Sequence, residues 1–179
     1  AINGWAMGAG SWFALFTHIT IASENAVFAQ PEVRHGSNTS FMWTLLGGFK
    51  NALRYGLTGD HIDAQEALRI GLVVKVVPAD QLLDECFSIV ERIAHIPPET
   101  VKINLQIATM GLQMMGLRDA LTLDNQLSAP AHVMLREELR RPLDEARFDE
   151  GTKKYLMLRD GPFQPEPFGP RSKKARGRA

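Results

Sequence analysis

Three small residues, Gly8, Ala9 and Gly10, are followed by Ser11 and the apolar run 12–16. A helix that begins at such a cluster has backbone N–H groups that no carbonyl within the helix accepts. Small side chains let a substrate oxygen approach these groups, and the helix dipole adds partial positive charge at the same end. The cluster can therefore stabilise negative charge on a carbonyl oxygen. A turn that merely packs closely would have the same pattern, so both interpretations stay open.

Other patterns that carry chemistry are missing from the sequence. GAGSWF has two of the three glycines of a dinucleotide-binding loop, and no phosphate-binding or Gly-x-Ser-x-Gly motif occurs. Cys86 falls inside a helical pattern with no histidine nearby, which indicates a core residue. The histidines lack the spacing of metal ligands; they are His18, His35, His61, His95 and His132. We therefore expect no metal site.

In residues 1–80, short strands and helices must position the cluster of small residues. Ser11 is expected to cap a short buried helix over 12–16. Strands are expected within 18–23 and within 26–32, where Pro31 ends the second.

The rest of the chain favours helices. A helical pattern over 41–57 is interrupted at Gly47-Gly48, and a further helix is capped by Asp63 and stopped by Gly71. From residue 81 onward the patterns are helical only, with Pro130 as an expected kink or break and a fourth helix over 142–160. The sequence therefore predicts an α/β part, 1–80, and a helical part, 81–160.

Composition limits the class of protein. The 179 residues are 45% hydrophobic with formal net charge +0, which suits one ordinary globular domain. No apolar run reaches the roughly 18 residues that would span a bilayer, and no signal peptide is recognised, so we expect a cytoplasmic location without membrane contact. The segment 161–179 is rich in proline and then basic, and we expect it to be disordered. A basic tail could contact nucleic acid, but no aromatic and basic platform accompanies it, so none is expected.

Three segments together resemble one family. INGWAMGAGSWFALFTHITIASENAVFAQPEVRHG, LTGDHIDAQEALRIGLVVKVVP and EGTKKYLMLRDGPF are similar, in this order, to segments of the enoyl-CoA hydratase/isomerase, or crotonase, family. The resemblance implies a crotonase-like β/α spiral whose N-terminal turns are missing, followed by an all-helical C-terminal trimerisation region. We therefore expect the chain to be a fragment of a longer protein or a partial one.

The resemblance also implies a catalytic site. The oxyanion donor of the family maps onto the backbone N–H of Ala9, and the catalytic carboxylate of the Pro-Glu motif maps onto Glu32. Without the resemblance, the sequence would indicate only that Glu32 is an exposed residue at the end of a strand. The second catalytic glutamate of the family maps onto Trp12, a departure that favours a wall of the acyl pocket over a catalytic group.

Further residues are expected to contact an acyl-CoA substrate. The loop after Glu32 differs from the family and implies a reshaped acyl pocket. His35 and Asn38 in this loop are either substitutes for the lost carboxylate, as Ser40 could also be, or plain loop residues. Tyr155, Arg159 and Phe163 either cover the coenzyme or only pack. The expected substrate-binding residues are Gly8, Gly10, Trp12, His35, Asn38, Tyr155 and Phe163.

One carboxylate favours isomerisation over hydration in this family. Glu32 alone can move a proton between two carbons, whereas hydration is easiest with two carboxylates. The expected function is that of an enoyl-CoA hydratase or isomerase with single-base proton transfer and no cofactor besides the coenzyme A of the substrate. A C–C bond or thioester hydrolase on the same scaffold and a non-catalytic oligomer subunit remain as alternatives. The resemblance implies a homotrimer or a dimer of trimers.

Overall fold

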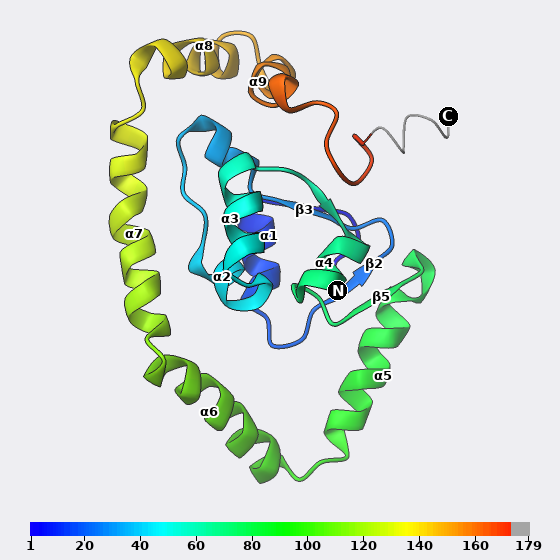
Figure 1. Ribbon diagram of the computed structural model, residues 1–179. Helices are drawn as coiled ribbons and strands as arrows, with labels where there is room; N and C mark the ends of the chain where they lie inside the picture. The colour runs from blue at the N-terminus through cyan, green and yellow to red at the C-terminus, as the bar shows by residue number, and fades with distance from the viewer. Residues whose placement is uncertain (173–179) are drawn as a thin grey trace.

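The computed structural model describes residues 1–172, apart from the side chain of His132. A core of short strands and helices occupies the N-terminal part of the chain, and a succession of longer helices surrounds it as an arc (Figure 1). The expected α/β class is confirmed. No helix in residues 1–172 is long and apolar enough to cross a membrane.

The strands form two small sheets. In the first sheet, β3 (Val27–Ala29) lies between β1 (Trp5–Met7), to which it is parallel, and β4 (Ile62–Asp63), to which it is antiparallel. In the second, β2 (Ile21–Ser23) and β5 (Lys75–Val77) are parallel. The chain changes sheet after β1, after β2 and after β4. This alternation agrees with the winding expected of a β/α spiral.

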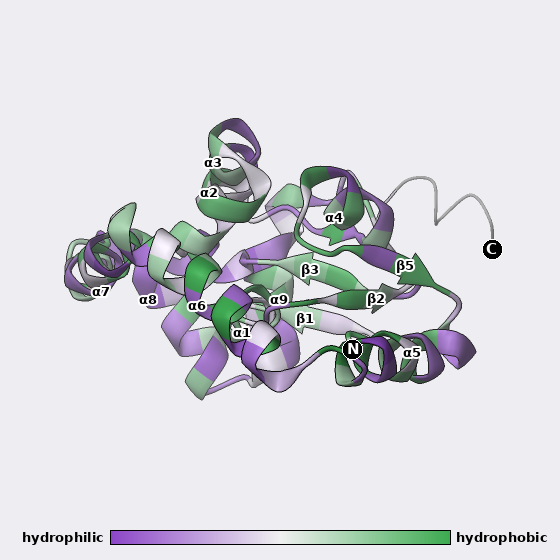
Figure 2. Ribbon diagram, turned by 90° about the horizontal axis from the view of Figure 1, so that it is seen from below, coloured by the Kyte–Doolittle hydropathy of each residue, from purple (hydrophilic) through white to green (hydrophobic). Residues whose placement is uncertain are grey.

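Four short helices enclose the strands around a core that includes Phe28, Trp43 and Ile62, each no more than 1% exposed. Seen from below, α2, α3 and α4 lie on one side of the strands and α5 on the other (Figure 2). The four helices are α1 (Ala9–Leu15), α2 (Phe41–Gly47), α3 (Phe49–Thr58) and α4 (Ala64–Ile70).

The expected capping of α4 is confirmed, and that of α1 is wrong. Asp63 Oδ1 accepts a hydrogen bond from Glu66 N at 2.9 Å, and Gly71 ends α4 with a φ of 88°. By contrast, Gly8 caps α1 with a φ of 53°, so the helix begins earlier than expected. Ser11 then faces the interior, where its Oγ makes no hydrogen bond within residues 1–172, and Phe13 is 77% exposed instead of buried.

Five helices form the arc: α5 (Leu82–Ala94), α6 (Pro98–Met114), α7 (Leu117–Val133), α8 (Glu137–Phe148) and α9 (Thr152–Asp160). Of the kink or break expected at Pro130, the break is wrong, because α7 continues for three residues beyond it, and the kink stays a prediction. The last two helices divide at Gly151, whose φ is 89°, and not at Pro142. Since α8 and α9 pack on each other and α9 contacts Pro31–His35, the arc returns to the core.

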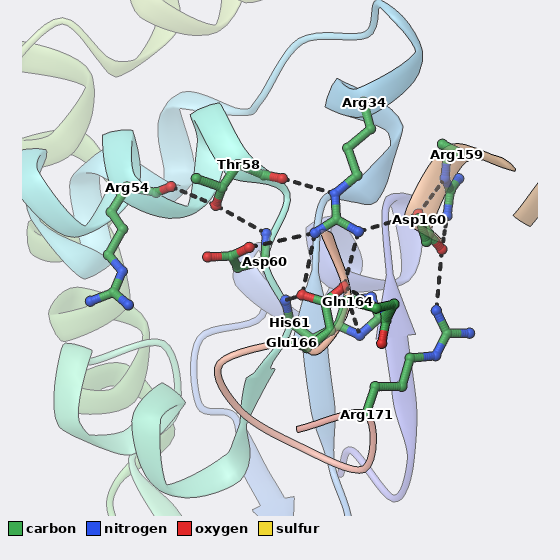
Figure 3. Close-up of polar contacts among 10 residues, drawn as sticks. All are labelled: Arg34, Arg54, Thr58, Asp60, His61, Arg159, Asp160, Gln164, Glu166 and Arg171. Atoms are coloured by element: carbon green, nitrogen blue, oxygen red, sulfur yellow. Dashed lines mark hydrogen bonds and ion pairs between the residues drawn. The ribbon is translucent and has the colours of Figure 1, made fainter. Parts of the chain in front are cut away.

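A buried cluster of charged residues joins the end of the arc to the core (Figure 3). The Arg34 side chain is 1% exposed, and its Nη1 lies 3.0 Å from Glu166 Oε1 and 3.3 Å from Asp160 Oδ1. Its Nε donates to Thr58 O at 2.8 Å, and the ring of Phe163 lies 4.0 Å from its guanidinium carbon. Charge-assisted bonds of this kind fix a planar guanidinium in one orientation.

The expectation that 161–179 is disordered is wrong for 161–172. Glu166 is 1% exposed and also accepts a hydrogen bond from His61 N at 3.1 Å, so the segment packs on the core. Proline content suggested disorder, whereas the structure buries the Glu166 carboxylate and pairs it with the Arg34 guanidinium. The remainder of the predicted tail, 173–179, lies outside the described residues.

Candidate active site

The carboxylate of Glu32 lies directly over the first turn of α1. A Cβ placed on Gly8 would be 2.6 Å from Glu32 Oε1, so only a glycine leaves room for the carboxylate there. Gly8 follows β1, and Glu32 follows β3, so the pairing of these parallel strands brings the two residues together. Gly8 N also donates to Ala29 O at 2.9 Å, which fixes the turn.

The first turn of α1 offers N–H groups beside this carboxylate. Trp12 N donates to Gly8 O at 3.0 Å, whereas no described residue accepts a hydrogen bond from the N–H of Ala9 or Gly10. Nothing lies within 4 Å of a Cβ placed on Gly10. The structure therefore brings together four of the predicted site residues: Gly8, Ala9, Gly10 and Glu32.

A cavity of about 340 Å³ opens against Glu32. Its wall combines β1, the Pro-Glu segment, the loop before β4, α9 and the C-terminal segment. The lining residues are Trp5, Met7, Gly8, Pro31, Glu32, His61, Leu156, Arg159, Asp160 and Arg171.

Burial sets the protonation of Glu32. Because the half-buried carboxylate loses contact with water, its pKa is raised above the ordinary value of 4.5. A hydrogen bond from its own backbone and the positive charge of Arg159 oppose this pKa rise. A carboxylate whose pKa moves toward neutrality becomes a better proton acceptor and donor at physiological pH.

Trp12 is held by a neighbour of the Pro-Glu motif. In one orientation of the Gln30 amide, all of its neighbours form hydrogen bonds with it. Its oxygen then accepts from the indole N–H groups of Trp12 and Trp43, and its nitrogen donates to Thr39 Oγ1. Gln30 is 2% exposed, so this cluster is internal. The N–H of Trp12 is thus engaged within the protein, and the indole is not among the residues that line the Glu32 cavity.

Other predicted residues lie away from Glu32. His35 Nδ1 lies 3.1 Å from Tyr155 Oη, and His35 Nε2 lies 3.4 Å from Asp144 Oδ1. Both contacts join the Pro-Glu segment to α8 and α9. Asn38 Nδ2 donates to Thr39 O at 3.0 Å, and its buried Oδ1 accepts no hydrogen bond from any residue that the structure describes. None of these side chains lines the Glu32 cavity, and neither does Phe163, which stacks on Arg34.

Sequence reasoning missed the polar wall of the cavity. His61, Asp160 and Arg171 line it together with Arg159, and the first two are 2% and 3% exposed. Asp160 accepts from Arg159 at 2.8 Å and from Arg171 at 3.2 Å. The sequence signal was slight: the pair Arg159-Asp160 lies inside the third family-like segment, whereas His61 lies in an ordinary polar turn. In residues 1–172, no group of acidic, histidine or cysteine residues could hold a metal ion.

The chain is similar to known proteins. A family model described as Enoyl-CoA hydratase/isomerase matches residues 1–164. The Short-chain-enoyl-CoA hydratase of Clostridium acetobutylicum is 40% identical over 117 residues, which are 63% of this chain and 45% of that protein. The Crotonyl-CoA hydratase of Syntrophomonas wolfei is 40% identical over 119 residues, 63% of this chain and 45% of that protein. The chain thus spans less than half the length of these curated relatives.

Solved structures agree. The crystal structure of an enoyl-CoA hydratase/isomerase from Xanthobacter autotrophicus Py2 covers 89% of this chain and 60% of its own, with a TM-score of 0.80 and 27% identity. An enoyl-CoA hydratase from Mycobacterium smegmatis covers 73% of this chain and 61% of its own, with a TM-score of 0.66 and 32% identity.

Proposed function

The chain belongs to the enoyl-CoA hydratase/isomerase family of enzymes, and from this premise we propose that it carries the catalytic base of an acyl-CoA isomerase or hydratase. The base is Glu32, and the N–H of Ala9 donates to the thioester oxygen of the substrate. The observation that carries the proposal is the Glu32 carboxylate against Gly8, beside N–H groups for which no residue in the described part of the chain is an acceptor.

The chemistry follows from these two groups. The Ala9 N–H stabilises the negative charge that grows on the thioester oxygen as the proton at the α-carbon leaves. Glu32 takes this proton, the double bond moves, and the same carboxyl returns the proton to the γ-carbon. The half-buried position of Glu32 beside the helix start supports a catalytic role over that of a subunit without activity.

The contact of Trp12 with Gln30 favours isomerisation. An indole has one N–H donor and no acceptor, so it cannot activate water as a carboxylate does. We expect the full natural protein to isomerise a 3-enoyl-CoA at least about tenfold faster than it hydrates the matched 2-enoyl-CoA, since an acid–base group contributes ~100-fold or more. Both rates are measured with purified protein by following the products. Equal rates would make the single-base assignment wrong, and cleavage of a β-diketone or a thioester would favour the hydrolase alternative.

The raised pKa of Glu32 predicts a pH dependence. Because the base must be ionised, kcat/KM should fall as the pH drops through that pKa, above 4.5. Arg159→Gln removes a positive charge that lowers the pKa of Glu32, so the acidic limb of the profile should move to higher pH. Arg92→Gln on α5 removes an equally positive but remote, exposed side chain and should leave the limb in place. A limb that Arg159→Gln leaves unmoved would contradict the assignment of the base.

The arc supports the proposal of a homotrimer or a dimer of trimers. Ile103, Ile107, Met110 and Met114 are 55%, 67%, 61% and 88% exposed, so these apolar side chains are not buried within residues 1–172. They recur at helical spacing along one stripe of α6. Light scattering of the full natural protein should give a multiple of three chains, and Ile107→Glu should reduce the mass. Ala108→Glu, away from that stripe, should not; a stable monomer in the wild type would exclude the proposal.

A further inference from the structure

His61 lies in the wall of the Glu32 cavity, where its ring packs edge-to-face against the ring of Trp5 with the centroids 5.5 Å apart. It is 2% exposed, and its ring makes no hydrogen bond to any described residue. Its Nδ1 is buried and lies 3.9 Å from Glu166 Oε1, beyond hydrogen-bonding distance. Buried polar atoms are nearly always hydrogen-bonded in folded proteins, so an unpartnered imidazole beside a catalytic cavity requires an explanation.

The surroundings define which edge of the ring is available. Glu166 is held by Arg34 and by the N–H of His61 itself, so its carboxylate cannot turn away (Figure 3). A carboxylate near Nδ1 favours the tautomer that carries its hydrogen on Nδ1. The lone pair is then on Nε2, at the opposite edge of the ring. Since Nδ1 is buried and the ring lines the cavity, the Nε2 edge is the one that a molecule in the cavity can meet.

The ring is neutral when the enzyme works. Burial lowers the pKa of His61, and the nearby charges divide: Glu166 and Asp160 raise it, whereas Arg171 and Arg34 lower it. Glu32 and Arg159 are the remaining ionisable groups of the same cavity wall. A neutral imidazole with a free Nε2 is a hydrogen-bond acceptor, which is the property that Trp12 lacks.

We propose that His61 is a positioning residue that orients a water molecule against Glu32 through a hydrogen bond to its Nε2. The proposal rests on the proposed function, and it attributes to His61 the slow hydration that is expected of a site with a single base. The cavity of about 340 Å³ has room for several waters, each of which takes roughly 30 Å³. His35, the other candidate for such a role, is engaged with Tyr155 and Asp144.

The step balances with one base. One hydrogen of the water is held by His61 Nε2, and the other is taken by the Glu32 carboxylate as the oxygen bonds to the β-carbon. The π electrons move to the thioester as an enolate, which the Ala9 N–H stabilises. Glu32 then gives the same proton to the α-carbon. The hydroxyl and the hydrogen that are added both come from the one water, and His61 keeps its own proton throughout.

The test compares hydration with isomerisation in variants of the full natural protein. His61→Leu should lower kcat for hydration by about tenfold to a hundredfold, since a poorly oriented nucleophile loses that much. Isomerisation needs no water, so its kcat should stay within about threefold of the wild-type value. His61→Gln, whose side-chain oxygen can accept the same hydrogen bond, should retain hydration within about fivefold. His18→Leu, at an exposed histidine, is the matched control and should change neither rate.

Each other outcome overturns the proposal. Equal loss of both reactions in His61→Leu, with a lower melting temperature, would make His61 a packing residue. Loss of hydration in His61→Gln as severe as in His61→Leu would exclude an orienting hydrogen bond. A wild type that isomerises without any hydration would leave His61 nothing to orient. A wild type that catalyses neither reaction would instead refute the proposed function, so the two failures are distinguishable.

Discussion

Replacing Glu32 with glutamine is expected to reduce turnover of acyl-CoA substrates by at least about 100-fold, the lower range for loss of a general base. Glutamine preserves the shape of the side chain and lacks a group that can take a proton at neutral pH. The dissociation constant for the acyl-CoA should change little, since the N–H of Ala9 remains in place. Turnover and binding are measured on the full natural protein, with Glu24→Gln, an exposed carboxylate in the turn before β3, as the matched control.

The stability of the same variant separates a lost base from a lost fold. Glu32 has a folded-state pKa raised by burial, so its contribution to stability is present below pH 4.5 and is lost as the pH rises through that raised pKa. At neutral pH the buried charge therefore costs stability, and glutamine removes this cost. The free energy of unfolding of Glu32→Gln at pH 7 should equal or exceed that of wild type. Near-normal turnover in a stable variant would contradict the assignment of Glu32 as the base.

Local signals in the sequence predicted some elements well. The cap at Asp63 and the stop at Gly71 depend on residues within one or two helical turns, so they could be read without knowing the fold. The same reasoning failed at Ser11, because a glycine with a φ of 53° starts α1 earlier and leaves Ser11 inside the core. The need for a glycine at position 8 comes from the close approach of Glu32, which lies in a different part of the sequence.

Long-range charges could not be predicted from patterns. Arg34 pairs with Asp160 and Glu166, which are 126 and 132 positions away along the chain. No periodicity marks such a pair, and the prolines around Glu166 suggested disorder. The burial of His61 follows from the same contacts, since Glu166 accepts its N–H. The resemblance to a family pointed to Glu32 and Ala9, but the polar wall of the cavity emerges only when the C-terminal segment is folded against it.

Gly8 provides the second large effect. Gly8→Ala should lower turnover by about 100-fold, because its new Cβ would lie 2.6 Å from Glu32 Oε1 and a displacement of roughly 1 Å at a reacting group costs that much. The positive φ of 53° adds backbone strain of about 1–3 kcal/mol, so the free energy of unfolding should fall as well. Gly48→Ala is the matched control: its φ is 77°, and nothing lies within 4 Å of its Cβ. It should lose stability and keep its turnover.

A double variant decides whether Gly8 acts through Glu32. If the Cβ at position 8 reduces turnover by displacing the carboxylate, then adding Gly8→Ala to Glu32→Gln displaces a side chain that is already inactive. The two losses should then be far from additive, and the double variant should turn over substrate about as slowly as Glu32→Gln alone. Full additivity would mean that the small residue at position 8 serves the substrate or the N–H groups of α1 directly. The variants can differ in stability. Turnover is therefore measured well below each melting temperature, so that every variant is folded in the assay.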